Sequence, residues 1–337
     1  MRTVTPLIKP HRRDLPLKVG TRGSPLARAQ TATFLAILKH FCPVLRGMEV
    51  FQEHIIVTTG DTVQDRSLAE IGGKGLFAKE IHESLAAGRI DFAVHSLKDL
   101  ETTLPPGIVL ACTLKREDAR DALILPPNHG KVDAADPYGA LRQGARIGTA
   151  SVRRQAQLKH ARPDLAFSLL RGNVGTRLAK IEAGEVEGTL LAYAGLRRLG
   201  LEEKASVVLD PETMVPSACQ GIVGITVRAA DTELLSMLAG IEDPEAKAVS
   251  TAERALLSAL DGSCRTPIGG YARILADGTL HLTGLVARAD GTFLLKRTIS
   301  GAKADAETMG RLAQPRCLRS LKDSMLVLFP WRRTGAL

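Results

Sequence analysis

The chain has 337 residues, of which 45% are hydrophobic and 4% aromatic, and its formal net charge is +9. This length predicts two or three domains of ~100–200 residues, with aliphatic cores. No apolar run approaches the ~20 residues of a membrane span, and the five cysteines show neither a CxxC pair nor zinc-ligand spacing. We therefore expect a cytoplasmic protein with free thiols, and the positive charge favours an anionic partner.

The first two-thirds of the chain alternate short apolar runs with helical patterns, after a basic, proline-containing leader at 1–16 that lacks the apolar stretch of a secretory signal. Strands are expected at 17–22, 53–59, 91–96, 107–114, 145–150, 165–172 and 188–195. Helices are expected at 24–41, 76–88, 151–161 and 173–184. Ser24 and Ser151 are placed as helix N-caps, and Pro25 suits a first helical position. This alternation predicts an α/β protein with a parallel sheet in each half.

The last third has a different pattern. A helix at 244–262 is followed by three strand-like runs within 271–301, which two Asp-Gly turns separate. A final helix is expected at roughly 305–328, where Pro315 should kink or split it. This region predicts a small α+β domain with a three-stranded antiparallel sheet.

Arginine follows the end of four of these strands. The cationic residues and the polar residues beside them are Arg22 with Ser24, Arg153 and Arg154 after Ser151, Arg171 with Arg177, and Arg197 with Arg198. Taken alone, Arg22 also fits an exposed arginine near an ordinary cap. Arg153 and Arg154 oppose the helix dipole, so a bound anion and a purely structural role explain them equally well. Four such strand ends together predict a ligand with several carboxylates or phosphates, which arginine binds in bidentate fashion.

Two further stretches have competing interpretations. "VHSLKD" places Ser96, Lys98 and Asp99 after a strand, where they would form either a surface salt bridge or an acid–base site. "AEIGGKGLF" does not have the spacing of a phosphate-binding loop. The polar, glycine-bearing region 58–75 around it is expected to form a mobile lid.

Cys264 lies in "LDGSCRTPIGG", just past a predicted helix. Such a thiol can be a buried filler, half of a metal site, a nucleophile or an attachment point, and free cysteines are most often buried and inert. The residues alone leave these alternatives open, although the spacing of the cysteines and histidines argues against a zinc site and against a disulfide framework.

Seven motifs occur in the order of one known family, which the chain resembles: the porphobilinogen deaminases, or hydroxymethylbilane synthases. They are "TRGSPLARAQ", "GGKGLFAKEI", "AVHSLKD", "GTASVRRQAQL", "LRGNVGTRLAK", "AGLRRLGL" and "CRTPIGGYA". The resemblance implies two α/β domains like type 2 periplasmic-binding proteins, with the chain crossing between them twice, and a small C-terminal α+β domain. The implied boundaries are 1–114 with 222–240, then 115–221, then 241–337.

The resemblance also implies a function. A transferase of this family joins four porphobilinogen units into hydroxymethylbilane, losing ammonia each time, for tetrapyrrole and haem biosynthesis. The chain grows on a dipyrromethane cofactor that a thioether attaches to the position matching Cys264. The expected partners are porphobilinogen and the growing polypyrrole, with no metal, nucleic acid or membrane, and the enzyme is expected to be monomeric.

Residue roles carry over by matching position. Asp99 matches the catalytic aspartate, which assists loss of ammonia and stabilises cationic intermediates. The positions implied to bind the cofactor are Arg22, Ser24, Ser96, Lys98, Ser151, Arg153, Arg154, Arg171, Arg177 and Gln220. Those implied to bind the substrate are Arg22, Arg171, Arg177, Arg198 and Phe77. On this interpretation, the anions missing beside Arg153 and Arg154 are pyrrole carboxylates.

The chain departs from the family pattern at four places. They are Leu100-Glu101 for the usual Val-Pro, Cys219 in place of a glycine before Gln220, Glu70 where some members have lysine, and Pro315 in the last helix. Cys219 is a candidate for a second reactive thiol. Two alternatives to an enzyme are a non-catalytic anion-binding module, which leaves Cys264 unexplained, and a nucleic-acid binder, which would interleave aromatic side chains with its cations.

Overall fold

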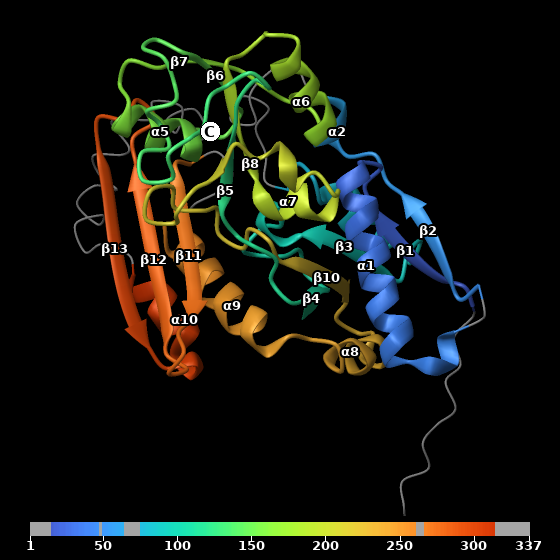
Figure 1. Ribbon diagram of the computed structural model, residues 1–337. Helices are drawn as coiled ribbons and strands as arrows, with labels where there is room; N and C mark the ends of the chain where they lie inside the picture. The colour runs from blue at the N-terminus through green and yellow to red at the C-terminus, as the bar shows by residue number, and fades with distance from the viewer. Residues whose placement is uncertain (1–14, 47–48, 64–74, 261–265, 314–337) are drawn as a thin grey trace, which may run out of the picture.

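The computed structural model describes residues 15–46, 49–63, 75–260 and 266–313, and these form three sheets (Figure 1). Four features predicted from the sequence lie wholly or largely outside the described residues: the leader, the region expected to form a lid together with Glu70, the cofactor cysteine Cys264, and Pro315.

The first sheet has five strands. In spatial order they are β2 (Phe51–Ile55), β1 (Leu17–Thr21), β3 (Phe92–Ser96), β10 (Val223–Arg228) and β4 (Ile108–Thr113). The helices beside it are α1 (Pro25–Phe41), α2 (Thr59–Thr62), α4 (Lys79–Ala86) and α8 (Thr232–Ala239), with the 3-10 turns η1 (Pro43–Leu45) and η2 (Leu97–Asp99). β1 runs parallel to β2 and β3, whereas β10 is antiparallel to both of its neighbours.

The second sheet repeats this plan. Its strands are β7 (Ala166–Ser168), β6 (Arg146–Gly148), β8 (Gly188–Ala192), β5 (Asp121–Ile124) and β9 (Val207–Val208). Its helices are α5 (Val152–Ala161), α6 (Val174–Glu182) and α7 (Tyr193–Arg198), followed by the 3-10 turn η3 (Glu202–Lys204). Here β5 is antiparallel to β8 and β9.

The prediction of a parallel sheet in each half holds for part of each sheet, because both sheets also contain antiparallel pairs. Each sheet contains a strand that the chain enters directly from the other domain, β5 after the first crossing and β10 after the second. Such a strand has no helical crossover from its neighbour in the sheet, so it is free to run antiparallel.

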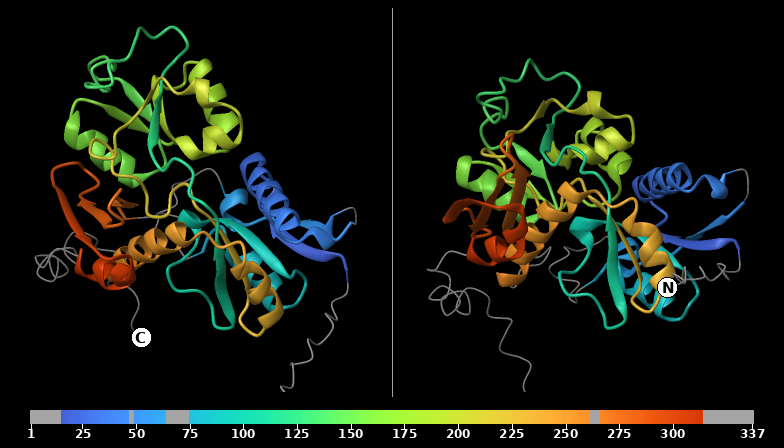
Figure 2. Two further views of the ribbon diagram at one scale, coloured as in Figure 1. Left: turned by 60° about the horizontal axis from the view of Figure 1, so that its bottom comes forward. Right: turned by 90° about the horizontal axis from the view of Figure 1, so that it is seen from below.

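The third sheet is an antiparallel meander of β11 (Ile268–Ile274), β12 (Leu280–Ala287) and β13 (Leu294–Gly301). The long helix α9 (Pro244–Ala259) and α10 (Ala306–Leu312), which follows the turn η4 (Lys303–Asp305), pack against it (Figures 1 and 2). The architecture is therefore the one expected, with two α/β domains between which the chain crosses twice and a small α+β domain. The boundaries assigned to the three domains stay a prediction.

Polar caps begin the helices at the cavity-facing strand ends. Ser24 Oγ accepts a hydrogen bond from the N–H of Ala27 at 3.3 Å at the start of α1, and Ser151 caps α5 through the N–H of Arg154 at 3.4 Å. Both predicted N-caps are confirmed. The helix expected at 76–88 begins only at Lys79, and Phe77 lies in the preceding turn. Because Phe77 precedes the helix, the helical repeat does not place its ring, which packs on the guanidinium group of Arg22.

A buried apolar cluster anchors the turn that carries Asp99. Leu97 and Leu100, on either side of it, are 1% and 4% exposed and belong to one cluster with Ile222 and the α9 residues Val249 and Leu256. Burying two leucines contributes ~1.5–3 kcal/mol each relative to exposing them. The third domain thus holds the Asp99 turn of the first.

The chain crosses between the first two domains in two segments, one between β4 and β5 and one between β9 and β10. A buried ion pair joins the third domain to both crossing segments. Glu253 on α9 is 0% exposed, its Oε1 lies 2.7 Å from Nη1 of Arg116, and it accepts hydrogen bonds from the N–H groups of Cys219 and Ala272. Removing one partner of such a buried pair typically costs ~3–5 kcal/mol, because the other charge stays buried. The Glu253 carboxylate therefore ties the third domain to both crossing segments.

The two crossing segments touch at Gly221. Its φ is +88°, and an added Cβ would lie 2.3 Å from the carbonyl oxygen of Glu117, whose own N–H donates to the Gly221 carbonyl at 3.1 Å. Only glycine fits this position, because it needs both a left-handed backbone and a close approach of two chains.

We expect Gly221→Ala to lower the free energy of unfolding by about 2–3 kcal/mol, because the new methyl group strains the backbone and displaces the first crossing. Urea unfolding monitored by circular dichroism measures this loss. The matched control is Gly130→Ala, where the Cβ meets nothing within 4 Å and φ is ordinary, so the change should stay within about 1 kcal/mol. Equal unfolding midpoints for both variants would contradict the argument.

Candidate active site

A cavity of about 520 Å³ opens between the first two domains, with residues of the third domain at one side. Leu257 and Thr266 line it, and these two residues bracket in sequence the segment that contains Cys264. Figure 2 shows the three groups of elements around this region.

Twelve of the predicted site residues line the cavity. They are Arg22, Ser24, Phe77, Ser96, Lys98, Asp99, Ser151, Arg153, Arg154, Arg171, Arg177 and Gln220. Arg198 is not among the lining residues, and its Nη2 donates to the Gly221 carbonyl at 2.7 Å. Cys264 lies outside the described residues. One enclosed space therefore brings together residues from strand ends that are far apart in the sequence.

Asp99 ends the 3-10 turn η2, which directly follows strand β3. Beside it, Lys98 Nζ donates to Gln220 Oε1 at 3.2 Å, and Ser96 Oγ exchanges a hydrogen bond with the amide of Gln30. Burial lowers the pKa of Lys98 to about 8, although the carboxylate of Asp99 acts in the opposite direction. Among the described residues no side chain forms a hydrogen bond or ion pair with the Asp99 carboxylate, so its oxygens are available to a ligand.

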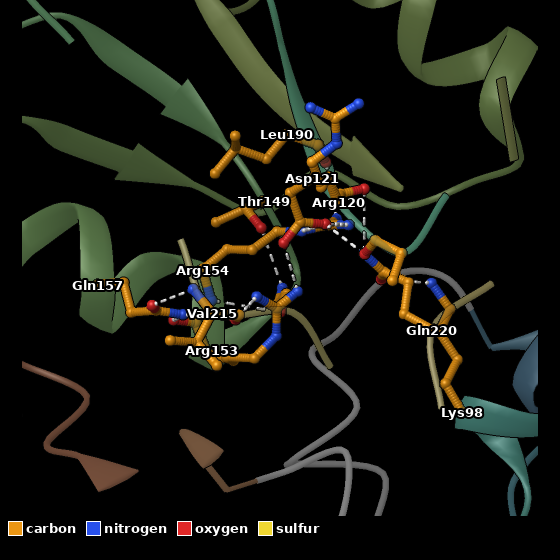
Figure 3. Close-up of polar contacts among 12 residues, drawn as sticks. Lys98, Arg120, Asp121, Thr149, Arg153, Arg154, Gln157, Leu190, Val215 and Gln220 are labelled. Atoms are coloured by element: carbon orange, nitrogen blue, oxygen red, sulfur yellow. Dashed lines mark hydrogen bonds and ion pairs between the residues drawn. The ribbon is translucent and has the colours of Figure 1, made fainter. Parts of the chain in front are cut away.

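The arginines at the start of α5 share one buried carboxylate, Asp121, which is 0% exposed (Figure 3). Asp121 Oδ2 lies 2.8 Å from Nη2 of Arg153, and Oδ1 lies 2.7 Å from Nη2 of Arg154. Each guanidinium also donates to a backbone carbonyl at 2.7 Å, Arg153 to Val215 and Arg154 to Leu190. Burial alone would raise the pKa of Asp121, but the two arginines and the hydrogen bonds hold it well below its ordinary value.

Asp121 changes the explanation for cations at this helix start. The sequence argument assigned their counter-charge to ligand carboxylates alone, whereas the protein itself supplies one anion for the two arginines. Sequence reasoning missed Asp121, although a lone acid opening the apolar run "DALIL" was a visible signal. Carboxylates that begin buried strands are rare unless they are paired.

On the opposite wall, Arg22 pairs with Asp61, with Nε and Oδ2 3.1 Å apart, and its guanidinium carbon lies 4.2 Å from the centre of the Phe77 ring. Arg171 reaches from the second domain to donate to the Gly60 carbonyl at 3.1 Å. The short helix α2 therefore contacts cations of both domains. Burial acts to raise the pKa of Asp61, but hydrogen bonds from Arg22 and Thr58 lower it overall.

Cations outnumber acids around the cavity. Six cationic side chains line it against two carboxylates, and Asp121 behind them adds a third. Arg177 shows the effect, because burial together with the charges of Arg154 and Arg171 lowers its pKa to about 10. Like charges held this close favour the binding of an anionic ligand. The donor set fits a dipyrromethane, whose acetate and propionate groups are carboxylates of the kind that guanidinium groups bind.

The departure at Leu100-Glu101 is accommodated by the third domain. Leu100 fills the buried cluster described above, and Arg254 of α9 donates to the carbonyls of Glu101 at 2.6 Å and Thr102 at 3.0 Å. An added Cβ on Gly75 would lie 1.8 Å from Glu101 Oε1, so the Glu101 side chain lies against this glycine. The Glu101 carboxylate therefore lies against Gly75, while Arg254 holds the backbone of the segment that follows Leu100.

Fold and cavity define a class, an α/β protein of two domains that the chain joins twice, with a cation-lined cavity between them and a third domain attached. Residues 17–236 match the family model described as porphobilinogen deaminase, dipyromethane cofactor binding domain, and residues 247–316 match the porphobilinogen deaminase C-terminal domain. The porphobilinogen deaminase of Nitrobacter winogradskyi is 44% identical over 94% of this chain and 97% of its own length. That of Roseiflexus castenholzii is 45% identical over 87% and 93%. The chain belongs to the porphobilinogen deaminase family.

Among solved structures, the periplasmic VFT2 domain of Bordetella pertussis BvgS is 13% identical, with a TM-score of 0.37, over 70% of this chain and 92% of that chain. Within the described parts of the chain no helix is long and apolar enough to cross a membrane. In the same residues no group of three or more His, Cys, Asp and Glu side chains has the arrangement of a metal site.

Cys219 has the backbone of the glycine it replaces, with φ at +62°, and its side chain is only 2% exposed. Burial raises the pKa of the Cys219 thiol to about 12, and the nearby Glu253 adds to this rise. The folded chain therefore does not present Cys219 as a second reactive thiol.

We expect iodoacetamide at pH 8 to alkylate Cys42, which is partly exposed, well before Cys112 and Cys219, which are buried. Peptide mass spectrometry after timed quenching gives the order of reaction. Cys112 and Cys219 should react only after denaturant is added. Native alkylation of Cys219 as fast as that of Cys42 would refute its assigned burial.

Proposed function

We propose that Asp99 and the cationic residues of the cavity carry out the reaction of this family, the joining of four porphobilinogen units into hydroxymethylbilane with loss of ammonia. The activity is that of a transferase in tetrapyrrole biosynthesis. The observation that supports the assignment is the convergence of Asp99 with five arginines and Lys98 around one cavity, in a chain whose family model is a dipyrromethane-binding domain.

The arginines are assigned to the carboxylates. Arg153, Arg154 and Lys98 stand on the side of Asp121 and Gln220, and we assign them to the cofactor. Arg22 and Arg171, which meet at the short helix α2, are assigned to the acetate and propionate groups of incoming porphobilinogen and of the growing chain. Guanidinium groups suit this role because each binds a carboxylate through two parallel hydrogen bonds.

Asp99 is assigned to the chemical step. Loss of ammonia from the aminomethyl group of porphobilinogen leaves positive charge on the pyrrole, and a carboxylate at the cavity wall stabilises that charge as it develops. The same oxygens can accept the pyrrole proton that is released when the new carbon–carbon bond forms. Lys98 beside it balances the negative charge of Asp99 before substrate arrives.

Cys264 is assigned as the attachment point of the cofactor. When bound, dipyrromethane supplies the primer onto which the four units are joined. The flanking residues Leu257 and Thr266 line the cavity, so the segment between them is short enough to present a thioether there. A permanent thioether makes Cys264 an anchor rather than a nucleophile of the catalytic cycle.

The remaining assignments extend the same proposal. The three domains divide at 1–114 with 222–240, 115–221 and 241–337. The enzyme acts as a cytoplasmic monomer on small molecules, without nucleic acid, membrane or metal. Ser24, Ser96, Ser151 and Arg177 are assigned to the cofactor, and Phe77, Arg177 and Arg198 to the substrate. Ser24 and Ser151 also cap α1 and α5, Phe77 packs on Arg22, and Arg198 donates to the Gly221 carbonyl.

We expect the intact mass of the purified chain to exceed the mass of its sequence by that of one dipyrromethane, with the addition on the peptide containing Cys264. Cys264→Ala should fold but carry no addition, because the thioether cannot form. The control Cys42→Ala removes a different thiol and should keep the addition. An unmodified wild-type protein that still makes hydroxymethylbilane would overturn the assignment.

We expect Asp99→Asn, which keeps the shape of the side chain and removes its charge, to lower kcat by about 10²–10⁴-fold, the range for loss of an acid–base group. Circular dichroism should show unchanged helix and strand content. The control Asp290→Asn alters an exposed turn of the third domain and should leave kcat unchanged. Near-normal bilane formation by the Asp99 variant would show that another group performs the chemistry.

A further inference from the structure

A continuous set of buried polar contacts links the start of α5 in the second domain to the Lys98–Asp99 turn of the first. It runs from Arg153 and Arg154 through Asp121 to Gln220 and on to Lys98 (Figure 3). Asp121 begins β5 just after the first crossing, and Gln220 precedes β10 on the second crossing. The contacts therefore pass through both segments that connect the first two domains.

Asp121 orients both arginines without neutralising them. Each carboxylate oxygen meets one guanidinium, and a backbone carbonyl meets another nitrogen of each. The protein therefore engages two nitrogens of Arg153 and all three of Arg154. One carboxylate faces two cations, so a positive charge remains in excess where Arg153 and Arg154 line the cavity. A planar group held in this way offers its remaining donors in a fixed direction.

Gln220 is fully buried and uses both ends of its amide. Its Nε2 donates to Asp121 Oδ1 at 2.9 Å and to the Ala119 carbonyl at 2.8 Å, while its Oε1 accepts from Lys98 Nζ at 3.2 Å. An amide suits this place because it donates to a carboxylate on one side and accepts from an ammonium on the other. Lys98 is the residue before Asp99.

We propose that Asp121 is a positioning residue for carboxylate binding by Arg153 and Arg154, and that Gln220 extends this positioning to the Lys98–Asp99 turn. The inference rests on the proposed function, since it concerns the same cavity. Asp121 sets where the cofactor carboxylates bind, and Gln220 sets where Asp99 stands relative to them. Gln220, which the family resemblance places at the cofactor, acts in this proposal through Asp121 and Lys98.

The first test is Asp121→Asn, which keeps size and removes the charge. We expect intact-mass spectra to show the dipyrromethane addition on less than half of the chains. In the loaded fraction the KM for porphobilinogen and kcat should each change less than about threefold, because Arg22 and Arg171, which are assigned to the substrate, do not contact Asp121. The matched control is Asp118→Asn, where the carboxylate pairs with Arg120 outside the cavity lining, and it should load and turn over as wild type. Full loading of Asp121→Asn, or a loss of turnover in its loaded fraction as large as the loss of loading, would overturn the positioning role.

The second test is Gln220→Met, which fills similar space without an amide. It leaves both arginine contacts of Asp121 intact, so loading should stay complete and KM should change little. The loss should appear in kcat, by about tenfold, because the Lys98–Asp99 turn loses its tie to Asp121. A wild-type kcat, or a loading defect equal to that of Asp121→Asn, would refute the assigned division of roles.

If Asp121→Asn does not fold, a crystal structure of the wild-type holoenzyme tests the positioning role of Asp121. We expect Arg153 and Arg154 to contact Asp121 and cofactor carboxylates at the same time. Separation of Asp121 from both arginines in the loaded enzyme would overturn the inference. A wild-type chain without dipyrromethane would instead contradict the proposed function, so the two failures are distinguishable.

Discussion

The cavity depends on the burial of Asp121 between Arg153 and Arg154. Two guanidinium groups at the start of a helix oppose its dipole and each other, and burial removes the water that would solvate them. One buried carboxylate makes the arrangement stable while leaving a net positive charge for a ligand. Stability and anion binding thus come from the same three side chains. A second carboxylate would complete the charge balance and remove the attraction for a ligand.

The two crossings of the chain between domains place Asp121 and Gln220 next to each other, so that polar contacts run from Arg153 and Arg154 to Lys98. Because β5 and β10 each enter a sheet from the other domain, the segments before them carry Asp121 and Gln220 to the boundary between domains. Glu253 then ties the same two segments to α9 through Arg116 and the N–H of Cys219. One helix therefore positions the crossing segments at one side and the leucines beside Asp99 at the other. The third domain acts as a brace for the cavity as well as the carrier of Cys264.

Much of the site could be predicted from short motifs. Ser24, Ser151 and the arginines that follow them signal helix starts at strand ends, and local hydrogen bonds produce those starts. The antiparallel strand in each sheet and the start of the helix at Lys79 instead of 76 were not predicted, since neither strand direction nor a three-residue shift in a helix start is encoded in apolar periodicity. Asp61 and Asp121 were missed because their partners are distant along the chain: Arg22 is 39 residues from Asp61, and Arg154 is 33 residues from Asp121.

The sequence by itself determined the family, the alternation of strands and helices, and which side chains stand at strand ends, because these follow from local patterns and ordered motifs. Only the tertiary structure decided which charges share a partner. Arg198 donates a hydrogen bond to the Gly221 carbonyl, Gln220 links Asp121 to Lys98, and the side chain of Cys219 is buried. The reason is physical: burial and charge pairing depend on distances between segments remote in sequence, and folding alone sets those distances.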